Sequence, residues 1–204
     1  MDRRHEKGPD WDRLFEAAQG QEGYFTTQQA HGAGYSSQLI VKHLQNGRMA
    51  RVQHGIYRLK HFPPGQQEDL VPIWLWSERV GVFSHETALG LHELSDILPA
   101  RIHLTLPARW RRRRLRIPKG VVVHHADVGR RERVWVGVVP VTSVQRTLAD
   151  CAADHLQPDL LEQAVRQAVA RGIVSKTQVA GVKRARVEPA ALVALVRTPQ
   201  NAPR

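Results

Sequence analysis

Two adjacent prolines constrain how this chain can fold more than any other feature. Pro63 and Pro64, followed by Gly65, cannot continue a strand ladder and favour extended backbone. They predict a linker between two domains, residues 10–62 and residues 66–197, with disordered tails at residues 1–9 and 198–204. The length of 204 residues suits two modest cores, because compact domains usually run to about 100–150 residues.

The first of these segments carries the signals of three helices. Asp10 can cap the first helix, Thr27 can cap a short second one, and Ser36 or Ser37 can cap the third. A turn containing two glycines separates the second helix from the third. We therefore expect a helical pair joined by a tight turn.

A basic β-hairpin is expected directly after the third helix. Apolar and basic residues interleave over residues 48–59, with Gly55 at the centre. From residue 36 to residue 60 there are five lysines and arginines and no acid. Helix, short helix, turn, capped helix and hairpin is the order of a winged helix-turn-helix, whose recognition helix enters the major groove of DNA.

The candidate DNA contacts are polar or basic residues of this segment. Lys42, Arg48 and Arg51 are expected to grip phosphates, while Ser37 or Gln38 is expected to read base edges. Two alternatives stay open, because helix pairs of this kind occur in many α-helical domains and basic hairpins are often merely solvated. The full set of candidates is Thr27, Tyr35, Ser36, Ser37, Gln38, Lys42, His43, Arg48, Arg51, Gln53, His54 and Arg58.

The charge balance favours a polyanionic partner. Thirty lysines and arginines face nineteen acids, which gives a formal charge of +11. Such a charge is attracted to nucleic acid, although anionic lipid would also attract it. No apolar run approaches the roughly 20 residues of a membrane span, the start lacks a secretory core, and Cys151 is the single cysteine. We therefore expect a cytoplasmic protein without a disulfide framework.

Strands and helices alternate irregularly in the second segment. Helices are expected at residues 68–79, 85–91, 142–153 and 159–171, and strands at residues 80–83, 101–106, 121–125 and 134–139. Further helical stretches are expected from Ser175 and around residues 192–196. The fold class expected for the whole chain is α+β, a winged helix-turn-helix followed by a mixed α/β domain.

Several motifs resemble the AbiEi-family antitoxins of bacterial type IV toxin-antitoxin systems. The N-terminal ones are GYFTTQQA (residues 23–30), GRMARV (47–52) and GIYRL (55–59). The later ones are SHETAL (84–89), IHLTLP (102–107), VTS (141–143) and RTLAD (146–150). The resemblance implies an antitoxin-type second domain and a repressor of its own operon. Such a repressor binds inverted promoter repeats as a monomer or weak dimer and counteracts a nucleotidyltransferase-like toxin, directly or only genetically, as part of phage defence.

An arginine-dense segment departs from that family pattern. It could neutralise phosphates, remain a solvated hairpin loop, or meet an acidic protein partner. The arginines of this possible secondary basic patch are Arg109, Arg111, Arg112, Arg113, Arg114 and Arg116.

No metal site is expected from the histidine spacings. Adjacent His124 and His125 would point to opposite faces of a strand, and His85 and His92 would lie two helical turns apart. Cys151 has no nearby cysteine and is interpreted as a small buried hydrophobe.

We expect no catalytic residues, no cofactor and no enzymatic activity. A nuclease would need paired carboxylates and a lysine, yet no acid stands two residues before a lysine. Capping and helical pairing explain Thr142, Arg146 and Asp150 without catalysis. The alternatives kept are a DNA-targeting nuclease-like protein and a non-catalytic interaction module with a DNA-binding head. Such a module would use tryptophans as anchors, and the candidates are Trp74, Trp76, Trp110 and Trp135.

Overall fold

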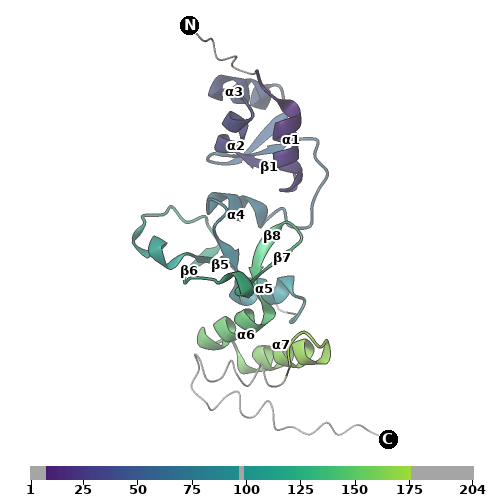
Figure 1. Cartoon of the computed structure of the whole chain (residues 1–204), viewed down its shortest axis with the longest axis vertical. Helices are drawn as coiled ribbons and strands as arrows, with labels where there is room; N and C mark the ends of the chain where they lie inside the picture. The colour runs from purple at the N-terminus through teal and green to yellow at the C-terminus, as the bar shows by residue number, and fades with distance from the viewer. Residues whose placement is uncertain (1–7, 97–98, 176–204) are drawn as a thin grey trace, which may run out of the picture. The chain divides into compact units, whose positions relative to one another are not determined.

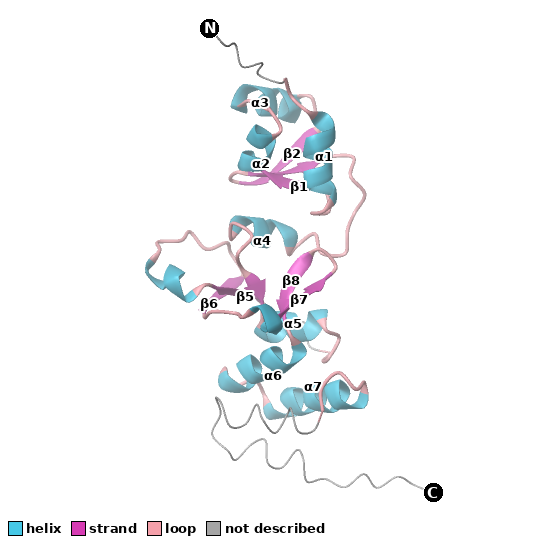
Figure 2. Ribbon diagram, in the orientation of Figure 1, coloured by secondary structure: helices cyan, strands magenta, loops and turns pink. Residues whose placement is uncertain are grey.

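The computed structural model describes residues 8–96 and 99–175, and its elements form two compact units. The first unit runs to Val80 and includes Gly137–Val139, and the second comprises Gly81–Val136 and the chain from Pro140. Each unit combines helices with one β-sheet, so the expected α+β class is confirmed (Figures 1 and 2). No helix among the described residues is both long and apolar enough to span a bilayer.

The first unit has the element order of a winged helix-turn-helix. Its helices surround a three-stranded sheet of order β1-β3-β2, in which both strand pairs are antiparallel (Figure 2). A β2–β3 hairpin follows α3, as expected, and turns at Gly55. The elements are α1 (Trp11–Gln19), β1 (Tyr24–Thr26), α2 (Thr27–Gly32), α3 (Ser37–Gln45), β2 (Met49–Gln53), β3 (Ile56–Leu59) and α4 (Val71–Trp76).

Side-chain caps begin the first three helices of this unit. Asp10 accepts from the backbone of Arg13, and Ser36 accepts from the backbone of Leu39. The cap expected at Thr27 is wrong by one residue, because Thr27 already lies in α2. Thr26 caps α2 instead through a capping box: its Oγ1 accepts from Gln29 N at 3.2 Å, and Gln29 Oε1 accepts from Thr26 N at 2.9 Å.

One apolar core holds the helices on the sheet. Leu14 and Ala18 of α1, Ala30 of α2 and Ile40 of α3 meet Phe25 of β1, and all are nearly inaccessible to solvent. Burial of this apolar surface fixes the turn between α2 and α3. The edge of α3 opposite Ile40 is left in solvent.

The contact boundary between the units lies after the proline linker that the sequence suggests. Gln53 donates to the carbonyl of Pro72 at 3.1 Å, and the backbone of Gln67 donates to Glu22 at 3.0 Å. Residues 66–80 therefore group with the first unit, whereas the sequence places them in the second domain. Prolines break strand pairing, but they do not prevent the following chain from packing on the strands before them.

The second unit contains a mixed five-stranded sheet of order β6-β5-β4-β8-β7. Strand β4 pairs antiparallel with β5 and parallel with β8, while β5 pairs parallel with β6. The elements are β4 (Val82–Phe83), α5 (His85–Leu91), β5 (Ile102–Leu106), η1 (Ala108–Arg112), β6 (Val121–His125), η2 (Arg130–Glu132), β7 (Arg133–Val136), β8 (Val139–Thr142), α6 (Val144–Ala153) and α7 (Pro158–Ala170).

Three helices stack beyond this sheet. Helix α5 lies against the sheet, and α6 and α7 follow it (Figure 1). Leu89 of α5, Leu148 and Cys151 of α6, and Ala164 of α7 share one buried core. The interpretation of Cys151 as a buried hydrophobe is therefore confirmed, and burial raises the pKa of its thiol, so the thiol stays protonated.

Three local expectations in the second unit need correction. The strand expected at residues 134–139 is two strands separated at Gly137, and Ser143 rather than Thr142 accepts from the backbone at the start of α6. Because β5 and β6 are parallel, the arginine-rich segment is a crossover and cannot be a hairpin loop. The helices expected from Ser175 and around residues 192–196, and the C-terminal tail, lie outside the described residues, as does most of the N-terminal tail.

Candidate nucleic-acid interface

The start and outer edge of α3 form a continuous polar surface. Ser36, Ser37, Gln38 and Lys42 are exposed, as expected for residues that could meet a duplex. Val41 lies on the same edge and is 50% exposed, although its place in the apolar pattern suggests a core residue. An exposed valine between polar residues can contact a thymine methyl group, so Val41 joins the candidate site.

Tyr35, just before α3, contacts His43 on the inner side of that helix. Their ring centroids lie 5.6 Å apart, and Tyr35 is only 4% exposed. The prediction that Tyr35 contacts DNA is therefore wrong, because its ring belongs to the core between α2 and α3. Burial, reinforced by Arg48 and Lys42, lowers the pKa of the half-buried His43, which is thus neutral at pH 7.

The turn between α2 and α3 is tied by a polar contact at the surface. Oγ of Ser37 lies 3.3 Å from Nε2 of His31, and both residues are exposed. This contact positions the first turn of α3 relative to α2 and leaves Gln38 outward.

The β2–β3 hairpin, which follows α3 in the sequence, carries exposed basic side chains. Arg48 and Arg51 are exposed on and before β2, and a guanidinium nitrogen of Arg51 lies 3.2 Å from Nδ1 of the exposed His54. Among the described residues no carboxylate pairs with Lys42, Arg48 or Arg51. Their charge is therefore available to phosphates.

The charge of Arg58 is not available to phosphates. It lies on the central strand β3, where its guanidinium donates to Glu68 Oε1 at 2.6 Å and to the carbonyl of Pro63 at 3.1 Å. It also lies 5.4 Å from the centroid of the Tyr24 ring. The predicted DNA contact of Arg58 is corrected to an internal ion pair.

Two further candidates are held by contacts within the unit. Thr27 Oγ1 donates to the carbonyl of Gly55 at 3.3 Å, and Gln53 Nε2 is bound to Pro72 as described above. Both side chains are half-buried and support the hairpin rather than extend from it. We define the DNA edge as the seven exposed candidates together with Val41: Ser36, Ser37, Gln38, Val41, Lys42, Arg48, Arg51 and His54.

The arginine-rich crossover of the second unit is a separate cationic surface. All six of its predicted arginines are exposed, and it is anchored by Trp110, which is 8% exposed. The guanidinium of Arg113 lies 4.1 Å from the Trp110 ring centroid, and Arg111 donates to the carbonyl of His125. Figure 1 shows this excursion between β5 and β6.

The tryptophans proposed as partner anchors are mostly internal. Trp74 and Trp110 are buried, and Trp76 is half-buried. Trp135 is 59% exposed on β7. An aromatic docking surface made of all four is therefore not present.

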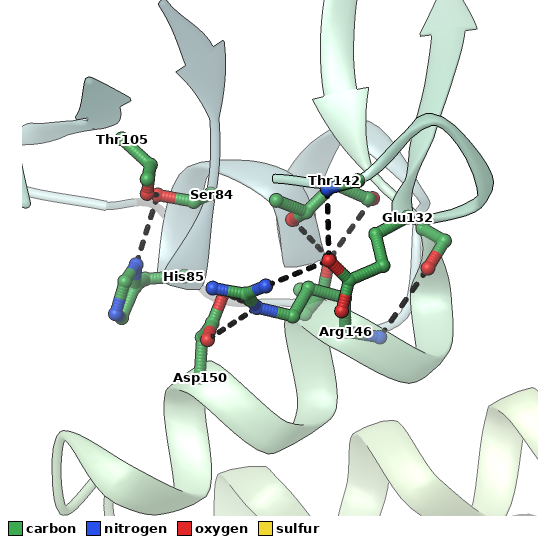
Figure 3. A network of polar contacts seen from close by, with 10 residues as sticks. Ser84, His85, Thr105, Glu132, Thr142, Arg146 and Asp150 are labelled. Atoms are coloured by element: carbon green, nitrogen blue, oxygen red, sulfur yellow. Dashed lines mark hydrogen bonds and ion pairs between the residues drawn. The ribbon is translucent and has the colours of Figure 1, made fainter. Parts of the chain in front are cut away.

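Polar side chains in the second unit form a buried network rather than a reactive constellation. Arg146 lies between the carboxylates of Asp150 and Glu132, and the hydroxyls of Thr142 and Thr147 lie 2.7 Å apart (Figure 3). These side chains satisfy one another's hydrogen-bonding groups within α6 and beside it. The geometry confirms the expected pairing of Arg146 with Asp150, whereas Ser143 rather than Thr142 caps α6.

The first unit combines a helix-turn-helix with a basic β-hairpin and an exposed cationic edge. Residues 12–60 match the family model described as transcriptional regulator, AbiEi antitoxin. The resemblance inferred from the sequence motifs is thereby confirmed, and these 49 residues carry it.

A solved structure has a fold similar to that of this chain. The RV2827C protein from Mycobacterium tuberculosis is similar, with a TM-score of 0.53 and 18% sequence identity. The similarity covers 94% of this chain and 83% of that one. No curated protein matches the chain.

Proposed function

We propose that this protein is a repressor that binds double-stranded DNA through the DNA edge of its first unit. The observation that carries the proposal is the exposed, acid-free surface formed by the outer side of α3 and the β2–β3 hairpin. A winged helix-turn-helix places these two elements against the major groove and the adjacent backbone. The family match to transcriptional regulators over residues 12–60 supports the same role.

The DNA edge contains residues that position the protein on the DNA backbone and residues that select the base sequence. Lys42, Arg48 and Arg51 neutralise phosphates, which gives affinity without sequence preference. Ser37, Gln38 and Val41, near the start of α3, face the base edges and offer hydrogen bonds and one apolar contact.

The biological role that we propose is that of an antitoxin of a type IV toxin-antitoxin system. The protein represses its own operon at inverted repeats, binding as a monomer or weak dimer, and it counteracts a nucleotidyltransferase-like toxin, by contact or through a shared target. Phage defence is the setting in which such a pair acts. The role requires no cofactor and no catalytic residue of this chain, and it places the protein in the cytoplasm with the chromosome.

The experiment is a titration of the full chain against the DNA upstream of its own gene and against a shuffled duplex of equal composition. We expect selective binding of the upstream DNA, by at least about tenfold, because specific sites exceed non-specific ones by large factors. Equal affinity for both duplexes at all salt concentrations would contradict the proposal that the protein is a repressor.

The same samples, incubated with Mg²⁺ or Mn²⁺, distinguish the nuclease alternative. Intact DNA after prolonged incubation agrees with a regulator. Metal-dependent cleavage that co-purifies with the chain would replace the repressor by a DNA-targeting nuclease.

A further inference from the structure

Three histidines from separate elements converge in the second unit. His85 begins α5, His103 lies on β5 and His124 lies on β6, and one potential ligand nitrogen from each lies within 4.8 Å of the other two. The parallel register pairs His103 with Val122 and Thr105 with His124. His103 and His124 therefore share one face of the sheet, the face on which α5 packs.

Two of these nitrogens already have nearly the separation that a metal requires. Nδ1 of His103 lies 3.0 Å from Nε2 of His124. Two imidazole nitrogens bound to a tetrahedral zinc ion at about 2.0–2.1 Å stand about 3.3 Å apart. Binding an ion in place of the shared proton would require the two nitrogens to separate by only a few tenths of an ångström, with each ring turning toward the ion.

His85, at the start of α5, is the third histidine of the cluster. Its ring stacks on His124 at a centroid distance of 3.6 Å and an interplanar angle of 15°. Stacked rings cannot direct lone pairs at one point, so the His85 ring must turn out of the stack to bind the same ion. A hydroxyl already orients this ring: its Nδ1 lies 2.9 Å from Oγ of Ser84, which in turn accepts from Thr105 Oγ1 at 2.8 Å (Figure 3). Nε2 of His85 is left for a ligand.

The surroundings suit a metal with nitrogen ligands. His85 and His103 are buried and His124 is half-buried, so His124 is the member most accessible to solvent. Burial lowers the pKa of all three imidazoles, which keeps them in the neutral form that binds metal ions. Glu86 and Asp154 act through charge on His103, and Asp154 acts also on His124, but neither carboxylate is a member of the set.

We propose that His85, His103 and His124 bind one divalent transition-metal ion of the zinc class. Three imidazoles are a ligand set that zinc uses when a fourth position stays open to water or to another group. The ion would join the start of α5 to β5 and β6. The proposal concerns the second unit alone and does not depend on DNA binding.

This proposal differs from the sequence-based expectation that the chain has no metal site. The expectation rested on pairs close in sequence, His124 with His125 and His85 with His92. The three converging residues are 18 and 21 positions apart in the chain, and the parallel pairing of β5 with β6 and the packing of α5 on β5 bring them together.

The test uses the full chain, freed of metal with a chelator and titrated with Co²⁺ and then Zn²⁺ in the absence of DNA. We expect one equivalent of Co²⁺ to develop the intense visible absorption of a tetrahedral or five-coordinate nitrogen site, and Zn²⁺ to displace it. The unfolding temperature should rise with metal concentration, because the ion binds the native state. A spectrum no stronger than that of the aqueous ion would overturn the proposal without any variant.

Variants locate the site. His85→Gln, His103→Gln and His124→Gln should each lower the affinity for Zn²⁺ at least tenfold, with far-ultraviolet circular dichroism as the check on folding. His125→Gln is the matched control, since it lies one residue along β6 on the opposite face, and it should bind as the wild type does. Folded variants of the three histidines that keep wild-type affinity would also overturn the proposal.

Discussion

Nε of Arg146 donates to both carboxylate oxygens of Asp150, at 2.8 and 2.9 Å, one turn apart on α6. Both side chains are almost completely buried, with 5% and 8% exposure. Nη1 of the same guanidinium donates to Glu132 at 3.0 Å, which ties α6 to the short helix before β7. Two residues that invite a catalytic interpretation in the sequence thus stabilise the second unit.

Removing Arg146 should strongly destabilise the protein. Arg146→Ala removes the guanidinium from the buried Asp150 carboxylate, and breaking such a pair costs about 3–5 kcal/mol. The measurement is the free energy of unfolding in urea. Arg166→Ala is the matched control, because the exposed Arg166–Glu162 pair has the same helical spacing and should contribute no more than about 0.5 kcal/mol. Equal losses for both variants would contradict a special role for the buried pair.

The capping box at α2 gives a prediction for the first unit. Thr26→Ala removes the oxygen that accepts from Gln29 N and should cost about 1 kcal/mol of stability. Thr26→Ser keeps that oxygen and should cost clearly less. Thermal unfolding of the three proteins checks this order, and a serine variant as unstable as the alanine variant would show that the hydroxyl is not what matters.

Acid should destabilise the metal-free protein. Burial, reinforced by His124, His103 and Arg146, lowers the pKa of His85 to about 3, well below the usual 6.5. Between these two values the unfolded chain binds a proton that the folded chain refuses, so stability falls as the pH drops below about 6.5. The pKa values of His92, His103 and His124 are also lowered by burial, and these residues contribute with the same sign.

The measurement for this acid effect is the free energy of unfolding at pH 7 and pH 5 with a chelator present. His85→Gln cannot titrate and should show a smaller fall between the two pH values, while His125→Gln should behave as the wild type does. Constant or increasing stability of the wild type toward pH 5 would be inconsistent with neutral buried histidines.

Local signals in the sequence were sufficient for most elements of the first unit. Asp10 and Ser36 cap helices where a short polar side chain precedes an apolar repeat, and the glycine at position 55 turns the hairpin. These features depend on neighbours within a few residues. Within the candidate site, helical spacing also predicted the exposure of Gln38 and Lys42 correctly.

Features that depend on distant partners could not be derived in this way. Tyr35 is a polar residue at a helix start, yet its ring fills the core, and the charge of Arg58 is neutralised by Glu68 from beyond the proline linker. The histidine set depends on which strands pair and in which direction. Periodicity along one strand carries no information about its partner.

Within the DNA edge, specificity and affinity should separate. Gln38→Ala should reduce the preference for the upstream DNA over the shuffled duplex, because it removes a base-edge contact. Lys42→Ala should weaken both duplexes alike and reduce the slope of log affinity against log salt by about 1. Titrations at several salt concentrations measure both effects, and an unchanged preference after Gln38→Ala would exclude Gln38 as a base reader.

The most direct measurement of the central claim compares two double variants that change the net charge equally. Lys42→Glu with Arg51→Glu alters the DNA edge, and Arg112→Glu with Arg114→Glu alters the arginine-rich crossover, so each pair lowers the formal charge by four. Both pairs are exposed, so neither should unfold the protein. Binding to the upstream duplex is measured at one low salt concentration. The expected result is a loss of at least a hundredfold for the first pair and a much smaller loss for the second, whereas retained binding by the first pair would contradict recognition through α3 and the hairpin.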